Sequence, residues 1–346
     1  MPEGPSLAEL GETALLQRLA VHAPPEQWND DAALLPPLQG ERWVISTDAL
    51  VEGVHFSAAT TPAWSVGWRA AAANLSDLAA MGCQRGAGFT VAVAAPGATP
   101  VGWLEQVYAG MGRALTQFGG QLLGGDCSRS DQIMLSITAI GAVNPTQLIR
   151  RDGGRCGDWL VVSGAHGLSG LGLRLLQAAA GQRELAPELQ QLEPSLQEAA
   201  IRAHQEPQPR FDAVAALHAS RPQGSPWRLG GTDSSDGLRR SLELLGDACG
   251  CRAELDPDHL PLPAGAPRCA AMQQLCLDGG EDFELVLALP EPWARGLLAE
   301  LPGARRIGQL GPAPAPPAGQ TQKTPCPGAG GLNTSAEVTL NQDAHF

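Results

Sequence analysis

The chain has 346 residues, 43% of them hydrophobic, and this length favours two domains over a single core. Its formal net charge of −13 argues against general nucleic-acid binding and against attraction to an anionic membrane surface. The 42 glycines and 29 prolines are numerous, but this apolar content indicates a folded α/β protein and not a disordered chain.

The lysine content excludes two classes of phosphate-transferring site. Lys323 is the only lysine, and it lies in a Pro/Gly-rich stretch near the C-terminus. A P-loop requires a lysine after its glycines, and a protein kinase requires a strand lysine against the nucleotide phosphates. Any handling of nucleotide phosphates therefore has to rely on metal ions, arginines and backbone amides.

The cysteines and the N-terminus suggest an intracellular protein. The eight cysteines include no C-x-x-C pair, and Cys249 and Cys251 are too close for an ordinary zinc site. We therefore expect reduced, packed thiols and a cytoplasmic location. The acidic N-terminus lacks the features of a secretory signal, and no apolar stretch approaches the ~20 residues of a membrane helix.

The first predicted elements are a helix and a strand with an acidic pair. Apolar residues at helical spacing predict a helix over 7–21, with Ser6 as its N-cap. Asp30 and Asp31 then lead into an apolar strand. Because successive side chains of a strand face opposite ways, only one of the two aspartates is expected to reach a shared site.

Oxygen-bearing side chains follow the next strand. The apolar alternation over 42–45 predicts a strand, which places Ser46, Thr47 and Asp48 at its end, where ligands usually bind. His55 comes seven residues after Asp48. Neighbouring oxygen donors suit a hard cation such as Mg²⁺. Taken alone, the same residues are more often a turn or a helix cap.

A lone carboxylate lies in the helix that follows. Residues 62–81 predict a long helix that ends at Gly82, and Asp77 lies there among small and apolar residues. A buried, unpaired carboxylate is costly, so Asp77 must be paired or bind something. A strand over 88–95 is expected next.

A third acidic segment follows a short strand. We expect a helix over 100–118, a short strand over 121–123 and a returning strand over 133–143. The short strand ends in a Gly-Gly-Asp loop at 124–126, whose glycines let the backbone approach a ligand closely. Gly-Gly-Asp is also common in ordinary turns.

The composition changes near the middle of the chain. It becomes polar and glycine-rich over 150–158, where we place a domain boundary. A strand over 159–163, a glycine-rich turn and a helix follow, an order that can hold an anion at a helix N-terminus. The turn lacks the G-x-G-x-x-G pattern of dinucleotide sites. Residues 177–206 are expected to be helical, and an acidic segment at 230–238 precedes another helix.

The last predicted elements are a strand and an irregular connection. An acidic, glycine-containing segment at 277–284 precedes an apolar strand over 285–289. From 311 to 331 the chain is dominated by Pro, Gly and Ala, and it is expected to form a flexible or extended connection.

Separated acidic residues recur in both halves of the chain, several of them at the ends of apolar strands. Each is by itself more often part of a solvated turn, but gathering like charges raises the cost of folding unless cations neutralise them. The sequence therefore predicts a site for more than one divalent ion, and without a P-loop those ions would bridge polyphosphate oxygens. The positions are Asp30, Asp31, Asp48, Asp77, Asp126, Asp233, Asp236, Glu281 and Asp282.

Five segments resemble, in order, the motifs of the thiamine-monophosphate kinase family. They are STDALVEGVHF at 46–56, NLSDLAAMG at 74–82, GGDCS at 124–128, DSSDGL at 233–238 and GGEDFEL at 279–285. The superfamily also contains aminoimidazole ribonucleotide synthetase, selenophosphate synthetase and a hydrogenase maturation protein. The first two segments favour the kinase over these relatives.

The resemblance implies an aminoimidazole ribonucleotide synthetase-like fold with an α/β and an α+β domain. Residues 1–149 would form the ATP- and Mg²⁺-binding domain, whose strands enter a dimer-spanning β-barrel. Residues 150–346 would form the α+β domain. The implied partners are ATP, several Mg²⁺ ions, thiamine monophosphate and a second copy of the chain.

Residues that match the family's motifs are expected to have four kinds of role. The implied metal ligands are Asp30, Ser46, Thr47, Asp48, Asp77, Asp126, Asp233 and Asp236. The implied nucleotide contacts are Tyr108, Gly125, Asp126, Arg151 and Ser235. The implied contacts to the thiamine substrate are His55 and Glu281. The residues implied in the catalytic step are Asp126, Arg151 and Asp236.

The chain departs from the family's pattern at four places. Asn29 replaces a glycine beside an expected metal ligand, and Asp278 stands where serine is common. Glu206 replaces an arginine before Pro207. The last residues, 342–346, lack the aromatic that the family often places near the substrate ring.

The implied reaction moves the γ-phosphoryl group of ATP onto the phosphate of thiamine monophosphate. No strong general base is needed, because a phosphate monoester has a second pKa of about 6 and is largely ionised at neutral pH. Catalysis would rest on positioning and on charge neutralisation by Mg²⁺, with Arg151 as an extra cation. Two alternatives stay open: another ATP-dependent enzyme of the superfamily, and a non-catalytic nucleotide-binding protein that kept the metal loops.

Overall fold

The computed structural model describes residues 5–313 apart from 11, 20 and 22–37. Asp30, Asp31 and most of the Pro/Gly-rich stretch at 311–331 lie outside the described residues. Within the described ranges, none of the helices combines the length and the apolar character needed to span a bilayer.

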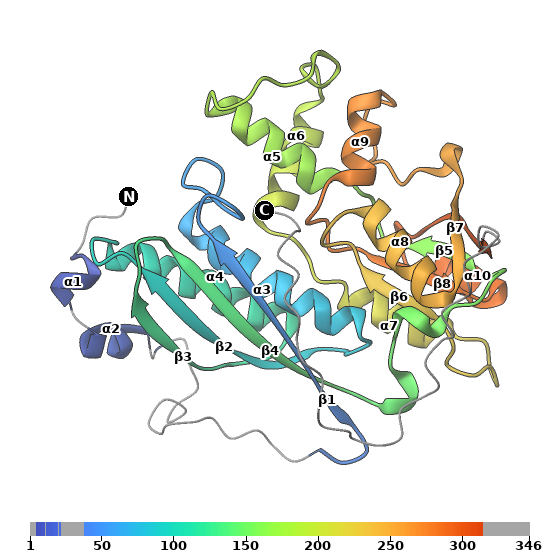
Figure 1. Ribbon diagram of the computed structural model, residues 1–346, viewed down its shortest axis with the longest axis horizontal. Helices are drawn as coiled ribbons and strands as arrows, with labels where there is room; N and C mark the ends of the chain where they lie inside the picture. The colour runs from blue at the N-terminus through green and yellow to red at the C-terminus, as the bar shows by residue number, and fades with distance from the viewer. Residues whose placement is uncertain (1–4, 11, 20, 22–37, 314–346) are drawn as a thin grey trace, which may run out of the picture. The chain divides into compact units, whose positions relative to one another are not determined.

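The described part contains two sheets and the helices that pack against them (Figure 1). The elements before residue 150 are α1 (Leu7–Leu10), α2 (Glu12–Leu19), β1 (Arg42–Val51), α3 (Ala63–Ala80), β2 (Gly86–Ala95), α4 (Val101–Phe118), β3 (Leu122–Arg129), β4 (Met134–Val143) and the short η2 (Pro145–Gln147). Those after it are η3 (Arg151–Gly153), β5 (Trp159–Val162), α5 (Leu168–Ala179), η4 (Pro187–Leu189), α6 (Pro194–Gln205), α7 (Phe211–Ser220), β6 (Gly230–Asp233), α8 (Leu238–Cys249), β7 (Cys251–Leu255), η5 (Pro257–His259), α9 (Ala270–Asp278), β8 (Leu285–Leu289), α10 (Glu291–Glu300) and β9 (Arg305–Pro312). This mixture confirms the expected α/β and α+β class.

The first sheet has four strands in the order β1-β4-β2-β3. Strand β4 pairs antiparallel with β1 and β2, whereas β3 runs parallel to β2 after the connection through α4. Helices α3 and α4 pack on each other and on one face of the sheet (Figure 1). The opposite face has no helix among the described residues.

The second sheet has five antiparallel strands in the order β6-β8-β5-β9-β7. Alternate residues of β8 enter different apolar cores, with Leu285 and Leu287 in one and Val286 and Ala288 in the other. Both faces of this sheet are therefore buried. The core that contains Leu287 is continuous with Phe89 of the first sheet. The division between 149 and 150 stays a prediction.

Most of the predicted elements are confirmed, but one helical stretch is interrupted. The helix predicted over 7–21 contains α1 and α2, and residue 11 between them lies outside the described residues. Its N-cap is present as a reciprocal pair, because Glu9 N–H donates to Ser6 Oγ at 3.3 Å and Ser6 N–H donates to Glu9 Oε2 at 2.8 Å. The helix predicted over 177–206 is wrong in its first half, since α5 ends at Ala179 and α6 begins only at Pro194.

Two strands continue through residues that were predicted to lie at a strand's end or in the loop after it. Ser46, Thr47 and Asp48 lie inside β1, which continues to Val51 by pairing with β4. The Gly-Gly-Asp segment lies inside β3, which runs to Arg129 beside β2. In both cases backbone pairing with a neighbour extends the strand through residues whose side chains are polar or absent.

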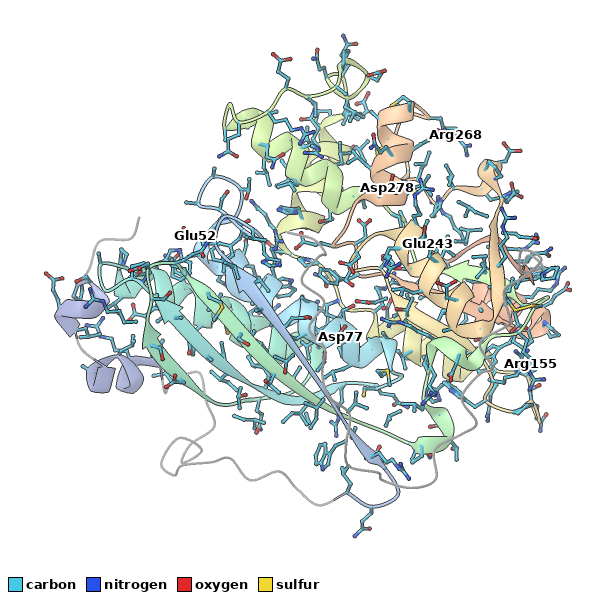
Figure 2. The ribbon with its side chains drawn as sticks, viewed as in Figure 1. Glu52, Asp77, Arg155, Glu243, Arg268 and Asp278 are labelled. Atoms are coloured by element: carbon cyan, nitrogen blue, oxygen red, sulfur yellow. A yellow bond between two sulfur atoms is a disulfide. The ribbon has the colours of Figure 1, made fainter. Side chains whose placement is uncertain are left out.

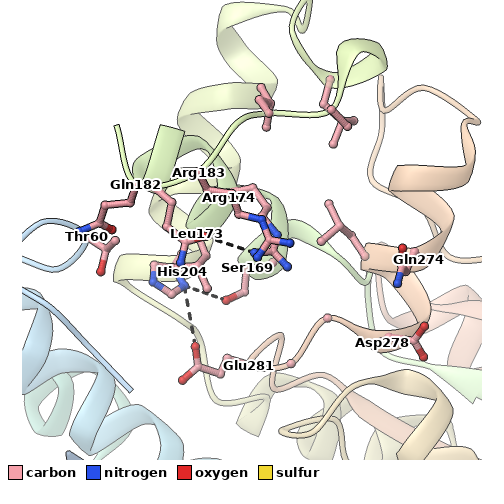
Figure 3. A pocket seen from close by; sticks show the side chains of 18 of the residues that line it. Thr60, Ser169, Leu173, Arg174, Gln182, Arg183, His204, Gln274, Asp278 and Glu281 are labelled. Carbon is pink, nitrogen blue, oxygen red and sulfur yellow. Dashed lines mark hydrogen bonds and ion pairs between the residues drawn. The ribbon is translucent and has the colours of Figure 1, made fainter. Parts of the chain in front are cut away.

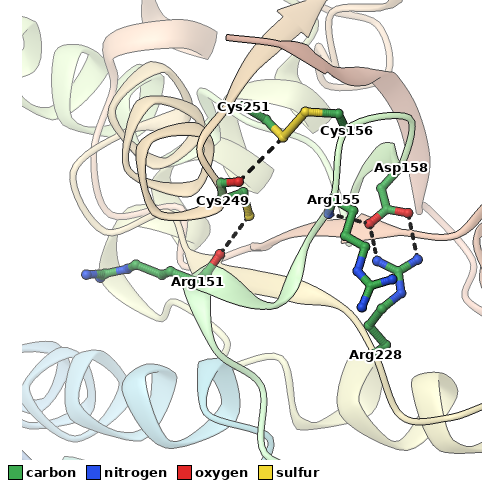
Figure 4. Close-up of a disulfide and its surroundings, with 7 residues drawn as sticks. All are labelled: Arg151, Arg155, Cys156, Asp158, Arg228, Cys249 and Cys251. Atoms are coloured by element: carbon green, nitrogen blue, oxygen red, sulfur yellow. Dashed lines mark hydrogen bonds and ion pairs between the residues drawn. A yellow bond between two sulfur atoms is a disulfide. The ribbon is translucent and has the colours of Figure 1, made fainter. Parts of the chain in front are cut away.

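The expectation of reduced thiols is wrong for one pair of cysteines. Cys156 and Cys251 form a disulfide with a Cα–Cα distance of 5.8 Å (Figure 4). Next to it, the Cys249 thiol donates a hydrogen bond to the backbone oxygen of Arg151 at 3.0 Å. Burial raises the pKa of the Cys83 thiol to about 12, which agrees with the packed thiol expected there.

Loss of the disulfide should lower stability. The bond closes a loop of 95 residues, so we expect Cys156→Ser to lower the free energy of unfolding by about 2–4 kcal/mol under oxidising conditions. Cys156 is exposed, so its hydroxyl replacement is not buried. Denaturant unfolding measures the loss, and a dithiol reductant should remove the difference between variant and wild type. Equal stability before reduction would contradict the prediction.

Candidate functional site

Helix α3 supplies partners to the two β1 residues that face it. Ser46 Oγ donates a hydrogen bond to Asp77 Oδ2, and Asp48 N–H donates to Asn74 Oδ1 at 3.0 Å. Asn74 is itself fixed, because its Nδ2 donates to the Ala70 carbonyl at 2.9 Å. The carboxylates of Asp48 and Asp77 therefore lie close together between β1 and α3, and Figure 2 marks Asp77 on that helix.

Strand β6 brings a third carboxylate to the same place. Ser76, the neighbour of Asp77 on α3, donates to Asp233 Oδ2 at 2.7 Å. Ser235 Oγ lies 3.5 Å from Asp233 Oδ1, and Ser241 Oγ donates to the backbone oxygen of Asp233 at 2.9 Å. The site thus joins a helix from the first half of the chain to a strand from the second.

Burial and mutual repulsion raise the pKa values of these carboxylates. Burial raises the pKa of Asp77 to about 7, and the charges of Asp233 and Asp48 add to the effect. Burial also raises the pKa of Asp233 and of Asp48, and Asp236 repels both. Arg151 is the cation that acts on Asp77 and Asp233 in the opposite direction. Negative charge gathered in this way favours a bound cation.

The donor atoms fit a hard divalent cation. Three carboxylates and the Ser46 hydroxyl supply oxygen, which Mg²⁺ prefers, and a cation would relieve the repulsion among Asp48, Asp77 and Asp233. Among the described residues, no three His, Cys, Asp or Glu side chains already form a group able to hold a metal ion. The fit therefore lies in donor chemistry and charge.

A cavity of about 1100 Å³ is lined by His55 and Glu281, whereas Asp48, Asp77 and Asp233 are not among its lining residues. His55 lies in the turn after β1, where its Nδ1 accepts a hydrogen bond from Val51 N–H at 3.1 Å. One backbone contact connects the cavity wall to the acidic site: Glu281 N–H donates to the Ser235 carbonyl at 2.7 Å. The structure thus brings together the two residues expected to contact the substrate.

The turn between α9 and β8 is strained and carries Glu281 to the cavity wall. Glu281 and Phe283 have positive φ values of 64° and 53°, a backbone conformation that non-glycine residues rarely adopt. Strain of this kind costs about 1–3 kcal/mol per residue and occurs mostly at functional sites. The intervening Asp282 anchors the turn by accepting backbone hydrogen bonds from Gly167 at 2.6 Å and Ser169 at 3.0 Å.

A buried arginine and a buried histidine lie behind Glu281. Arg69 of α3 forms an ion pair with both oxygens of Glu281, at 2.6 and 2.7 Å. It also contacts His204 Nε2 of α6 at 2.7 Å and donates to the His55 carbonyl at 2.9 Å. Figure 3 shows His204 between Ser169 and Glu281 at the cavity wall.

His204 should make the protein sensitive to acid. Burial, helped by the charge of Arg69, lowers the pKa of His204 to about 3 from an ordinary value of 6.5. A lowered folded-state pKa means that unfolding takes up a proton, so stability is lost as the pH falls from about 6.5 toward 3. The slope for this one group is at most about 1.4 kcal/mol per pH unit.

Substitution of His204 isolates this contribution. We expect the unfolding free energy of His204→Gln to fall less steeply between pH 6.5 and 4 than that of the wild type. The difference in slope should correspond to the uptake of nearly one proton fewer on unfolding. Denaturant unfolding at several pH values measures both slopes. The exposed His259, changed to Gln, is the control, and equal slopes for His204→Gln and the wild type would contradict the assignment.

Four residues with expected roles lie away from the acidic site. Thr47 points to the opposite face of the first sheet, where its hydroxyl is 2.9 Å from that of Thr138. Asp126 is exposed on β3 and accepts a hydrogen bond from Ser128 Oγ at 2.9 Å. A side chain at Gly125 would collide with the Val91 carbonyl, which explains this glycine by strand packing. The fourth residue, the α4 tyrosine Tyr108, is buried.

The sequence did not reveal the residues that support the site. Asn74 and Ser76 were within a recognised motif, but their contacts depend on which face of α3 packs against β1 and β6. Arg69 is the lone charge in the first half of the helix predicted over 62–81, and a buried charge there requires a partner. The sequence therefore indicates that Arg69 has a partner, although it does not identify Glu281 as that partner.

Comparison with known proteins places these features in one family. The model named AIR synthase related protein, N-terminal domain, matches residues 29–143. A thiamine-monophosphate kinase from Synechococcus elongatus is 48% identical over 307 residues, which cover 88% of this chain and 90% of that protein.

Solved structures agree with the sequence comparison. The crystal structure of thiamine-monophosphate kinase from Stenotrophomonas maltophilia K279a has a TM-score of 0.72 and 32% identity, covering 88% of this chain and 95% of that one. AaThiL complexed with AMPPCP and TMP has a TM-score of 0.66 and 27% identity, covering 90% and 94%. The resemblance between these proteins and the chain therefore spans both sheets.

Proposed function

The chain belongs to the thiamine-monophosphate kinase family, and on this premise we propose that it transfers the γ-phosphoryl group of ATP to thiamine monophosphate, forming thiamine diphosphate. The observation that carries the proposal is the group of carboxylates Asp48, Asp77 and Asp233, which a backbone hydrogen bond from Glu281 to Ser235 links to the wall of the cavity lined by His55 and Glu281. A relative of known structure binds an ATP analogue together with TMP.

We propose that the acidic site holds Mg²⁺ together with the two phosphate groups. The ligands proposed from the acidic site itself are Ser46, Asp48, Asp77, Asp233 and Asp236. The family resemblance adds Asp30, Thr47 and Asp126, of which the Thr47 and Asp126 side chains lie away from that site. Bound Mg²⁺ would supply neutralisation of phosphate charge. The Ser46 and Ser76 hydroxyls orient two of the carboxylates, and Arg151, whose Nε donates to Thr232 Oγ1 at 3.2 Å, would pair with a phosphate.

The nucleotide and thiamine contacts are also proposals. The proposed nucleotide contacts are Tyr108, Gly125, Asp126, Arg151 and Ser235, and the residues proposed for the catalytic step are Asp126, Arg151 and Asp236. His55 and Glu281 would contact thiamine monophosphate. Because the acceptor phosphate is already ionised near neutral pH, the chain has only to position it in line with ATP and exclude competing water.

We further propose a homodimer, a cytoplasmic location and a division into domains at 149/150. Support for the dimer comes from the helix-free face of the first sheet, where Ile45 is 65% and Met134 is 37% exposed. A second copy that covers this face would form the barrel expected for the family. ATP as co-substrate supports the cytoplasm, where the Cys156–Cys251 disulfide would be open to reduction.

The acceptor assay tests the proposed function against its alternatives. ADP formation is measured with thiamine monophosphate, with thiamine, and with other phosphate monoesters, amides and selenide as acceptors. Among these acceptors, we expect only thiamine monophosphate to support ADP formation. Turnover with another acceptor would favour a different enzyme of the superfamily, and ATP binding without turnover on any acceptor would favour a binding protein.

A further inference from the structure

Arg69 is the most deeply buried charge next to the cavity. Its side chain is only 3% exposed, whereas that of its partner Glu281 is 33% exposed and faces the cavity. The guanidinium uses Nη2 for both oxygens of Glu281 and for the His55 carbonyl, and Nη1 for His204. One side chain thus contacts both residues proposed to touch the substrate.

The contacts continue beyond Arg69 and return to the same turn. His204 Nδ1 lies 3.2 Å from Ser169 Oγ, and Ser169 N–H donates to Asp282 at 3.0 Å. Asp282 directly follows Glu281 in the strained turn. The chain of contacts from Glu281 through Arg69, His204 and Ser169 to Asp282 therefore closes on itself, and it fixes the turn from two sides.

The hydrogen-bond donor next to His204 determines the tautomer of its imidazole. Guanidinium nitrogens only donate hydrogen bonds, and Arg69 Nη1 lies 2.7 Å from His204 Nε2 but 3.5 Å from Nδ1, so the shorter contact assigns Nε2 as the acceptor. The proton of the neutral ring is then on Nδ1, which faces Ser169 Oγ at 3.2 Å and lies 3.8 Å from Glu281 Oε2. Arg69 is consequently the cation that balances the charge of Glu281.

We propose that Arg69 is a positioning residue, which holds the carboxylate of Glu281 at the cavity wall and His204 in its Nδ1–H form, and thereby sets the affinity for the organic end of the substrate. Because its charge is balanced, Glu281 would serve as an oriented hydrogen-bond acceptor for a donor group of the ligand, such as an amine. The inference rests on the proposed function only for the identity of that ligand.

The kinetic test combines Arg69→Met with Glu281→Gln. We expect Arg69→Met to raise KM for thiamine monophosphate about 10- to 100-fold, the loss typical of a charged hydrogen bond, while kcat and KM for ATP change less than about threefold. In the Glu281→Gln background the same substitution should change KM less than about threefold, because both residues act through one contact. Arg113→Met, an exposed arginine of α4, is the matched control.

An NMR measurement tests the same inference without turnover. Nitrogen-15 spectra of the full chain should show His204 as the Nδ1–H tautomer in the wild type and lose that preference in Arg69→Met. Arg69→Lys keeps the charge but not the two-sided contact. It should give an intermediate KM and serves if the methionine variant does not fold.

The outcomes separate the inference from the proposed function. An Nε2–H tautomer in the wild type, or equal effects of Arg69→Met in both backgrounds, would overturn the role of Arg69. A different result would support the role of Arg69 and reject the proposed function. In that case the wild type does not phosphorylate thiamine monophosphate, but Arg69→Met still loses the tautomer preference of His204.

Discussion

Asp77→Asn is expected to lower kcat by at least about 100-fold while leaving the protein folded. Even changes to residues that merely orient metal ligands cost 10- to 100-fold, and Asp77 is proposed as a ligand itself. The fold should tolerate the change, because the asparagine oxygen can still accept from Ser46 and the repulsion from Asp48 and Asp233 is removed. Steady-state kinetics and thermal unfolding measure the two effects on one preparation.

Asp131→Asn provides the matched control, since Asp131 is exposed between β3 and β4. We expect this variant to retain wild-type kcat. The metal assignment would be contradicted if Asp77→Asn kept wild-type kcat. A loss of activity that followed a lower melting temperature would instead show that Asp77 serves the fold.

Arg210→Met is expected to lower the free energy of unfolding by about 3–5 kcal/mol. Arg210 forms an ion pair with Glu284, and the two side chains are only 12% and 15% exposed. Burial raises the pKa of Glu284, and Arg210 opposes that shift. Removing one partner of a buried pair leaves the other charge uncompensated, which is far more costly than losing a surface pair.

Two further variants separate the buried charge from ordinary loss of contacts. Arg295→Met breaks the exposed pair with Glu291 and should cost less than about 1 kcal/mol. Adding Glu284→Gln to Arg210→Met should recover part of the loss, because the uncompensated charge is gone. A cost for Arg210→Met no larger than that for Arg295→Met, measured by denaturant unfolding, would refute the prediction.

The sequence was sufficient where a pattern is local. Apolar periodicity and Gly82, with φ of 89°, predicted α3 and its end, and the isolated carboxylate of Asp77 correctly indicated a polar partner. The motif resemblance identified the family and grouped Asp48, Asp77 and Asp233. His55 and Glu281, far apart in the sequence, line one cavity as residues with a shared ligand would.

Strand ends could not be predicted, because they depend on pairing between segments distant in sequence. The polar residues 46–48 were predicted to lie at the end of a strand, yet pairing with β4 continues β1 through them to Val51, and α3 supplies the inward-facing Ser46 with a partner. The alternation of side chains along β1 then sends Thr47 to the other face. The contact of Arg69 with Glu281 joins residues 212 positions apart and has no local signal.

The central claim is tested most directly by the product formed from thiamine monophosphate and ATP. Chromatography of the thiamine compounds, after incubation with Mg²⁺ and in parallel with a chelator of divalent cations, separates the monophosphate from the diphosphate. We predict thiamine diphosphate only when Mg²⁺ is present, in an amount equal to the ADP released. Unchanged thiamine monophosphate in the presence of Mg²⁺, in protein that is folded and binds ATP, would contradict the account.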